Sequence, residues 1–378
     1  MNKKFNEIRS YNDSEVTKII KKLCKEKVFI NLITQFNPTA TPKLIIEKLQ
    51  SIKTIYDFQI QVLYPMAKTI LRRSSSGITY SGLENVRKDV PYLFISNHRD
   101  IILDPALLNY IFFQNGYDTC YIAIGNNLLI YSWINDLVKL AKCFVVKRNI
   151  PFSQIFDQSK ILSSYIRYII NEQKDSVWIS QREGRTKDGD DKTHSAVLKM
   201  LSLSSNKPIV SSFEELNILP VSISYEYEPC DFLKATETYK KLINNSYKKT
   251  PKEDLKSMIT GIVAQKGRIH FNFGKALKPE LKTLSNIDNK PEQLRQIALM
   301  IDDNIYANYK LWETNYIAYD LLNKTNSFAD KYSEKAKDAF ASYIDKIVRM
   351  MKEESLLIED FLLEIYANPV KNILSLKK

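Results

Sequence analysis

The chain has 378 residues, 44% of them hydrophobic, so it can bury a large core and has room for two or three domains. Its four cysteines lie far apart without a CxxC pair, and it has only three histidines. This argues against a disulfide framework or a structural zinc site and fits a reducing compartment. The formal net charge of +12 predicts an anionic partner, such as a membrane surface, a phosphorylated substrate or nucleic acid.

The start of the chain does not read as a targeting segment. Its first residues, MNKKFNEIRS, lack the apolar core of a secretion signal. No stretch of the sequence approaches the ~18 uninterrupted apolar residues that a membrane span needs. We therefore expect a cytoplasmic protein that is soluble or peripheral on a membrane.

Residues 1–74 are predicted to be helical. Apolar residues recur near a 3.6-residue period in EVTKIIKKLCKEKVFINLITQF and again in IYDFQIQVLYPMAKTILRR. The second stretch ends in two arginines, and an amphipathic helix of this kind can lie on a membrane. The alternative, which we favour, is that the apolar stripe packs against a core.

From Ile78 onward, short apolar runs alternate with helical stretches. The runs are PYLFIS, TCYIAI, CFVVKR, SVWIS, ILPVSISYEY and RIHFNFG, and the helices are expected near residues 105–114, 127–141, 153–173 and 194–205. Such alternation predicts an α/β fold with a central, mostly parallel sheet flanked by helices.

After Gly274 the sequence shows no strand pattern. Residues 291–322 and 328–373 are rich in Lys and Glu and have helical spacing. The chain is thus predicted to consist of a helical N-terminal region (1–74), an α/β domain (75–280) and a helical C-terminal region (281–378).

The first candidate site lies in FISNHRDIILDPALLNY, where His98 follows a buried run and precedes a helix. Parallel α/β folds place functional groups at such positions. Asp104 stands before Pro105, which predicts that Asp104 is the N-cap of the helix and Pro105 its first residue. If the loop curls back, the second carboxylate oxygen of Asp104 could orient the His98 imidazole. Asp100 is the alternative partner.

Two basic clusters follow other predicted strands. KCFVVKRN places Arg148 at the end of one run, and SQREGRTKDGDDKTH follows another. In the second cluster the loop residues are Arg182, Glu183, Gly184 and Arg185. Two arginines on a tight loop can form a donor array for phosphate, and a solvated charged loop is the alternative. In a parallel sheet, His98, Arg148 and Arg185 would lie at one edge.

Taken in order, these motifs resemble those of the glycerolipid acyltransferase superfamily, which includes glycerol-phosphate and lysophosphatidate acyltransferases. GLENVRKDVPYLFISNHRDIILD resembles the first motif, KCFVVKRN the second, QREGRTKDG the third and ILPVSISYE the fourth, and RIHFNFGKAL is similar to the strand that follows. The resemblance covers about residues 78–280. Five residues separate His98 from Asp104 where the family has four, and Arg185 stands where Thr is commoner.

The resemblance implies an acyltransferase that moves a fatty acyl group from acyl-CoA or acyl-carrier protein to a hydroxyl of a lysophospholipid or glycerol-phosphate-type acceptor. His98 would be the general base and Asp104, or alternatively Asp100, would orient it. Arg148 and the 182–185 loop would bind the anionic part of a substrate. Neither a metal nor a bound cofactor is implied.

Lysophosphatidate is the expected acceptor, while a lyso-aminolipid acceptor and a non-catalytic lipid-binding relative stay open. The positive charge and the N-terminal helices fit docking on the inner face of an anionic membrane. A nucleic-acid-binding or acidic-partner-binding protein is the competing interpretation, supported by the charge and the 22 tyrosines. We expect no nucleic-acid partner, because no nucleic-acid-binding motif appears and the aromatic residues fall within apolar runs.

Overall fold

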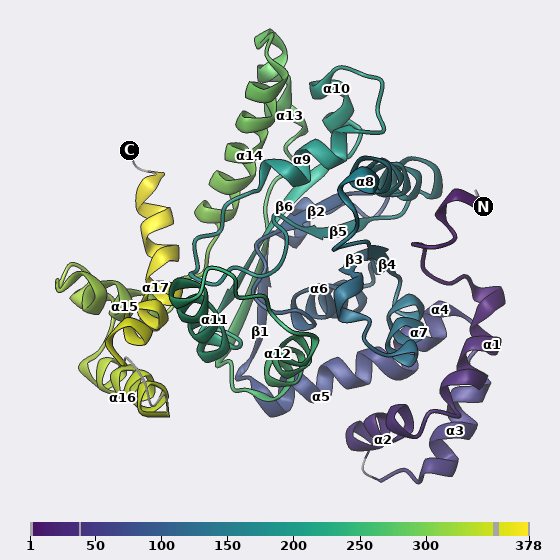
Figure 1. The fold of residues 1–378 in the computed structure, drawn as a ribbon, viewed down its shortest axis with the longest axis horizontal. Helices are drawn as coiled ribbons and strands as arrows, with labels where there is room; N and C mark the ends of the chain where they lie inside the picture. Colours follow the sequence, from purple (N-terminus) through teal and green to yellow (C-terminus); the bar gives the residue numbers. More distant parts are fainter. Residues whose placement is uncertain (1–2, 38, 351–354, 377–378) are drawn as a thin grey trace.

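The computed structural model describes residues 3–37, 39–350 and 355–376. A seven-stranded sheet lies at its centre, in the order β1-β7-β6-β2-β5-β3-β4, with helices around it (Figure 1). The strands are β1 (Gly77–Ser81), β2 (Leu93–Ser96), β3 (Tyr121–Gly125), β4 (Cys143–Val146), β5 (Val177–Ser180), β6 (Ile218–Tyr225) and β7 (Arg268–Phe273). The predicted α/β fold with a mostly parallel sheet is confirmed.

Strands β2 to β6 run in one direction, whereas β7 pairs antiparallel with β6 and parallel with β1. β1 and β7 therefore run opposite to the other five. The six predicted runs all form strands, but β1 was not predicted. Its sequence, GITYS, contains polar residues and is mostly exposed, so it lacks the apolar run by which the buried strands are recognised.

The buried strands pack on both faces. Leu93 and Ile95 of β2 belong to one hydrophobic cluster, and Phe94 between them belongs to another on the opposite face. This follows from the alternation of side chains along a strand and explains why β2 begins with the continuous apolar run LFI. Because β2, β4 and β5 run in the same direction, their carboxyl ends lie at the same edge of the sheet.

The chain before β1 is helical, as its periodicity predicts. Its helices are η1 (Lys3–Phe5), α1 (Asp13–Leu23), α2 (Lys27–Phe36), α3 (Pro42–Ser51), α4 (Ile55–Phe58), the π-helical turn η2 (Gln59–Leu63) and α5 (Tyr64–Ser74). The apolar stripe of α1 and α2, including Ile20 and Phe29, is buried together with Phe58 in a hydrophobic cluster that also includes Leu140 of the later helix α7 (Ser132–Leu140). Packing, rather than exposure, thus accounts for the stripe.

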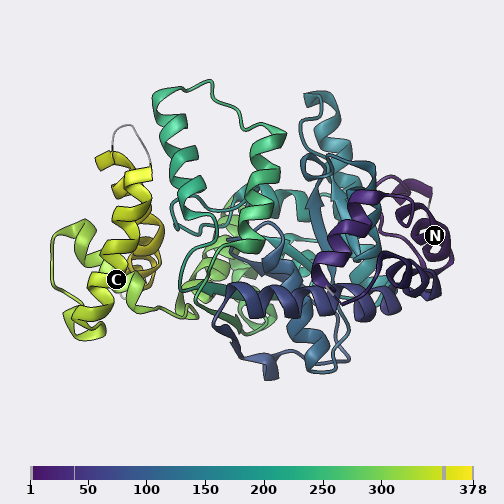
Figure 2. The same ribbon diagram turned by 90° about the horizontal axis from the view of Figure 1, so that it is seen from below.

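Helices connect the strands of the sheet. They are η3 (Leu83–Asn85), α6 (Leu103–Gln114), η4 (Asn126–Leu128), α7 (Ser132–Leu140), α8 (Phe152–Arg167) with the π-helical turn η5 (Tyr168–Gln173), α9 (Ser195–Ser202), α10 (Ile209–Glu214), α11 (Asp231–Ile243) and α12 (Pro251–Val263). The four predicted stretches all contain helices. The hairpin of α11 and α12, which projects from the body in Figure 2, was not predicted.

The described residues after Gly274 contain helices and no strand, as predicted. The helices are α13 (Lys278–Leu281), η6 (Lys282–Asn286), α14 (Lys290–Ala307), α15 (Glu313–Asn323), η7 (Ala329–Lys331), α16 (Glu334–Met350) and α17 (Ser355–Ser375). Helix α17 packs against α15 and α11. Across the ranges that the structure covers, none of the helices has both the length and the apolar character needed to cross a bilayer.

Candidate active site

His98 and Asp104 form a hydrogen-bonded pair at the carboxyl end of β2. The Nδ1 atom of His98 lies 2.8 Å from Oδ2 of Asp104. Asp104 is fully buried, whereas 12% of the His98 side chain is exposed. The imidazole packs edge-on against Trp178 of β5, with ring centroids 5.6 Å apart. No hydrogen bond from any described residue reaches Nε2, so that atom can accept a proton from a ligand.

Three further donors hold the Asp104 carboxylate. Its Oδ2 also accepts hydrogen bonds from the backbone N–H groups of Arg99, at 2.6 Å, and Asp100, at 2.9 Å. Its Oδ1 accepts one from the Tyr225 hydroxyl of β6, at 2.8 Å. These bonds fix the carboxylate against the loop that carries His98. The two side chains therefore meet because the loop folds back toward the helix, and not because they share a face of one helix.

The prediction that Asp104 is the helix N-cap is wrong. Helix α6 begins at Leu103, so that Asp104 lies within its first turn and Pro105 is the third helical residue. Asp100 takes the capping role, because its Oδ1 accepts hydrogen bonds from the N–H groups of Ile102 and Leu103. The longer loop between His98 and Asp104 accommodates both carboxylates, each with a separate set of donors.

Asp100, the alternative partner, does not contact His98. It is fully buried, and its Oδ2 has no hydrogen-bond partner among the described residues. Burial, and then the neighbouring charge of Asp104, raise the pKa of Asp100. The structure therefore brings Asp104, and not Asp100, to the imidazole.

The loops after β4 and β5 lie together beside this pair. The backbone N–H of Arg148 donates to Asn126 at 2.8 Å, and the Arg148 guanidinium lies 3.4 Å from the Glu183 carboxylate. Gly184, between Glu183 and Arg185, has a φ of +71°, a left-handed conformation that favours glycine. The backbone N–H of Thr186 donates to the carbonyl of His98 at 3.0 Å, which ties the arginine loop to the histidine loop.

The arginines of this loop keep unpaired donors. Arg185 is only 5% exposed, and its Nη1 has no hydrogen-bond partner among the residues described. The buried Nε of Arg182 is also unpaired. A buried guanidinium N–H without an acceptor is unfavourable, so an anionic group that reached these atoms would be bound well.

Sequence reasoning missed Lys187 and the contacts that the α11–α12 hairpin makes beside the site. Lys187 lies 2.7 Å from Glu237 of α11, and burial, followed by the charge of Arg185, lowers the pKa of Lys187 to about 7. Asp254 of α12 accepts a hydrogen bond from Asn127 at 3.0 Å. Lys187 could have been found two residues after Arg185, but its surroundings depend on a hairpin that has no motif.

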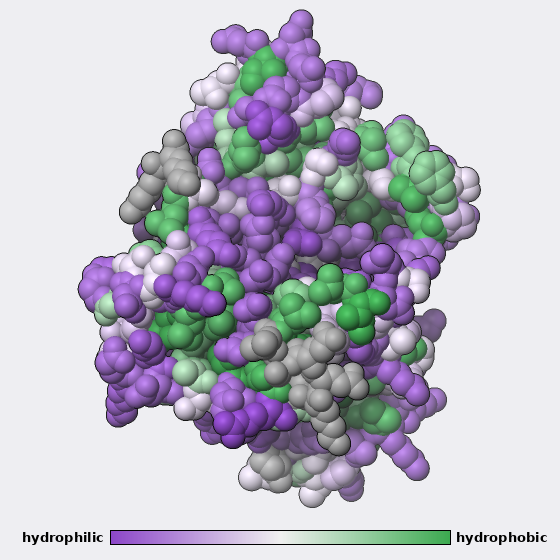
Figure 3. Space-filling model, turned by 60° about the vertical axis from the view of Figure 1, so that its left-hand side comes forward, coloured by the Kyte–Doolittle hydropathy of each residue, from purple (hydrophilic) through white to green (hydrophobic). Residues whose placement is uncertain are grey.

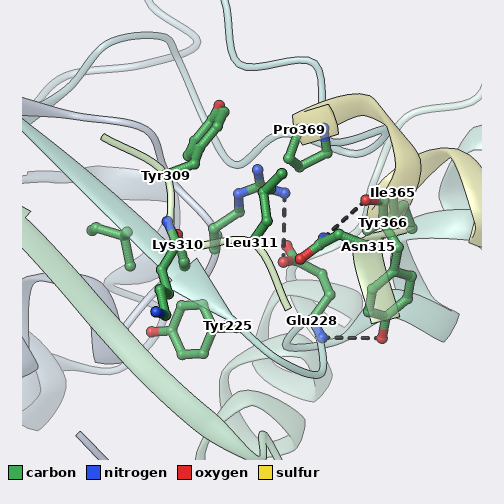
Figure 4. Close-up of a pocket in the computed structure, with 12 residues that line it drawn as sticks. Tyr225, Glu228, Tyr309, Lys310, Leu311, Asn315, Ile365, Tyr366 and Pro369 are labelled. Atoms are coloured by element: carbon green, nitrogen blue, oxygen red, sulfur yellow. Dashed lines mark hydrogen bonds and ion pairs between the residues drawn. The ribbon is translucent and has the colours of Figure 1, made fainter. Parts of the chain in front are cut away.

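A buried ionic network holds Arg99, the residue that follows His98 in the loop. Arg99 donates to Asp191 at 2.5 Å and lies 3.5 Å from Glu228, which pairs with Lys234. Lys234 also donates to the carbonyl of Arg99 at 2.9 Å. The adjoining cavity of about 20 Å³, drawn in Figure 4, has room for a water molecule and not for a substrate. This network therefore positions the loop.

No set of three His, Cys, Asp or Glu side chains converges as a metal site would require, within the described ranges. The chemistry that the site offers is proton transfer at His98 and anion binding at the arginines. The two functions lie on loops joined by the bond from Thr186 to His98.

Part of the chain matches a known protein family. Residues 77–224 match the family model described as Acyltransferase. No curated protein matches the chain. Among solved structures, the fold is similar to the 1-acyl-sn-glycerophosphate (LPA) acyltransferase PlsC from Thermotoga maritima, with 12% identity, a TM-score of 0.38, and coverage of 79% of this chain and 96% of that chain. The residues that match this family model include the His98 loop and the Arg185 loop.

Proposed function

We propose that the protein transfers a fatty acyl group from a thioester, acyl-CoA or acyl-carrier protein, to a hydroxyl of a lysophospholipid or glycerol-phosphate-type acceptor. Lysophosphatidate is the acceptor that we propose first. The observation that carries the proposal is the pair of His98 and Asp104, 2.8 Å apart, on a loop that is hydrogen-bonded to the loop whose arginines have unpaired donors. A phosphate-bearing alcohol is the acceptor class that such a combination serves.

In the proposed reaction, His98 acts as a general base. Asp104 accepts the Nδ1–H bond and leaves Nε2 as the basic nitrogen. Nε2 takes the proton of the acceptor hydroxyl as its oxygen attacks the thioester carbonyl. When the tetrahedral intermediate collapses, the carbon–sulfur bond breaks and the thiolate recovers a proton from the imidazolium. The acceptor oxygen is the nucleophile, so no acyl-enzyme forms.

The arginines would hold the anionic part of a substrate during this reaction. Arg185 and Arg182 offer unpaired N–H groups, and Arg148 lies on the adjoining loop. Glu183 orders the loop through its ion pair with Arg148, although its side chain is 71% exposed. We further propose that the protein works in the cytoplasm, peripherally on the inner face of an anionic membrane, where its net charge of +12 favours binding.

A thioester-release assay tests the proposal. Purified protein with acyl-CoA should release free CoA when lysophosphatidate is added, and His98→Ala should lower the rate by about 10²- to 10⁴-fold. Glycerol 3-phosphate and a lyso-aminolipid are the comparison acceptors. If the folded wild-type protein releases no thiol with any acceptor, from either acyl-CoA or acyl-carrier protein, the proposed function is wrong.

A further inference from the structure

The edge of the sheet that carries His98 is flanked by two projecting elements, the first turns of α8 and the α11–α12 hairpin. Figure 2 shows the start of α8 and the loop between α11 and α12 standing out on the same side of the molecule. The site links them: Arg148, four residues before Phe152, is 3.4 Å from Asn127, and Asn127 donates to Asp254 of α12. Whatever these elements contact is therefore brought close to the arginines.

The start of α8 exposes large apolar side chains to water. Phe152 is 91% exposed, Ile155 46% and Phe156 59%. Their spacing of three and four residues places them on one face of the helix. At the end of α11, Leu242 and Ile243 are 59% and 61% exposed.

Exposed apolar side chains are not spread evenly over at least one face of the molecule. On the face drawn in Figure 3, hydrophobic residues gather in separate patches within a predominantly hydrophilic surface. Adjacent exposed aromatic residues on a helix end, next to a substrate site, are typical of a surface that binds a partner. The phenyl groups of Phe152 and Phe156 meet this description.

The hairpin adds positive charge to the same side. Residues 240–256 contain six lysines and two acidic residues. Of these lysines, Lys241, Lys248, Lys252 and Lys256 are exposed. Exposed phenyl groups accompanied by lysines suit an anionic lipid surface, because the rings enter the headgroup boundary while the ammonium groups stay at the phosphates.

We propose that the first turns of α8 and the tip of the α11–α12 hairpin are the surface by which this protein sits on an anionic phospholipid bilayer. The inference rests on the proposed function, since a lipid acceptor must leave the bilayer close to His98. The inference moves the docking surface away from residues 1–74, because the apolar stripe of α1 and α2 is buried in a hydrophobic cluster that also includes Leu140 of α7. An acidic carrier protein is the competing occupant of the lysines, but it gives no reason for Phe152 to be so exposed.

Vesicle co-sedimentation of the full chain tests this surface. The double variant Phe152→Ser/Phe156→Ser should bind vesicles of equal parts phosphatidylglycerol and phosphatidylcholine about tenfold or more weakly than wild type. Lys248→Glu/Lys252→Glu should also bind at least about tenfold more weakly, with the difference shrinking at high salt. The matched control is Val28→Ser/Leu44→Ser, which removes apolar side chains that are 60% and 56% exposed on the N-terminal helices. The control should stay within about twofold of wild type.

Several outcomes would overturn the inference. These are wild-type protein that does not bind the vesicles, a phenylalanine variant that binds as well as wild type, and a control that loses as much binding as that variant. Binding that responds to acyl-carrier protein and not to vesicles would equally overturn it. Thioester release from a short-chain, water-soluble acyl-CoA to a short-chain acceptor should be unchanged in all three double variants. If the wild type shows no such release and yet docks through Phe152 and Phe156, the proposed function fails and the docking surface stands.

Discussion

Replacing Asp104 by Asn separates the catalytic role of this residue from its structural one. The carboxylate accepts four hydrogen bonds, three at Oδ2 and one at Oδ1. An asparagine can keep the geometry, because its amide oxygen replaces Oδ2 and its amide nitrogen donates to the Tyr225 hydroxyl, which also accepts. The negative charge next to the imidazole is what the substitution removes.

The two effects differ in size. A hydrogen bond to a charged group contributes about 1.5–3 kcal/mol and a neutral one about 1 kcal/mol, so the free energy of unfolding should fall by about 1–3 kcal/mol. The imidazolium that forms in the proposed reaction would lose its counter-charge, so kcat should fall by about 10²- to 10⁴-fold. KM should change little, since Asp104 is fully buried and does not reach the substrate.

Steady-state thioester release and urea unfolding measure these two effects. Asp100→Asn is the matched control: burial raises the pKa of Asp100, which favours its neutral form, and its capping oxygen has an amide equivalent. We expect its kcat to stay within about threefold of wild type. If Asp104→Asn lowers stability and leaves kcat within that range, the pair with His98 is structural and the reasoning fails. A larger loss of kcat for Asp100→Asn than for Asp104→Asn would refute it as well.

Three further substitutions probe the surroundings of the site. Tyr225→Phe removes the donor to Oδ1 of Asp104, so kcat should fall about threefold to tenfold in steady-state assays, and an unchanged kcat would show that the backbone donors suffice. Burial raises the pKa of Asp302 to about 7, so the folded protein holds this proton more tightly than the unfolded chain. Stability should therefore fall as the pH rises from about 4 to about 7, and Asp302→Asn should flatten this slope in urea unfolding, an equal slope being the contrary result. Gly261→Ala places a Cβ 2.0 Å from Oδ2 of Asp100, so the free energy of unfolding should fall by about 1–3 kcal/mol. An unchanged free energy of unfolding would contradict this expectation and show that α12 shifts freely.

Buried strands and long amphipathic helices were predictable because each follows from a local pattern. LFI, CFVV and VWI are continuous apolar runs, as expected of strands buried on both faces. The stripe of α1 and the spacing of Ile297, Ile301 and Ile305 on α14 gave helices by the same reasoning. The convergence of the His98, Arg148 and Arg185 loops followed from the parallel direction alone.

The remaining features depend on contacts between distant parts of the chain. The reversed direction of β7 is a matter of tertiary pairing that its own sequence, RIHFNF, does not record. The donor to Asp104 from Tyr225 comes from 121 residues away. The usual preference for Asp before Pro at a helix start predicted that Asp104 is the N-cap. In the structure, the carboxylate of Asp100 instead accepts the hydrogen bonds from the N–H groups at the start of the helix. Local propensity could not distinguish two carboxylates that compete for the same turn.

The last helix also contacts the loop that follows Arg185. Asn368 of α17 donates to the carbonyl of Asp188 at 2.7 Å, and a Cβ on Gly189 would lie 2.3 Å from the carbonyl oxygen of Ile365. During synthesis on the ribosome, the arginine loop emerges long before this helix. The loop therefore lacks these contacts with α17 until almost the whole chain has been synthesised. Full activity should appear only after translation ends, and a nascent chain halted before residue 355 would carry every motif without a finished substrate site.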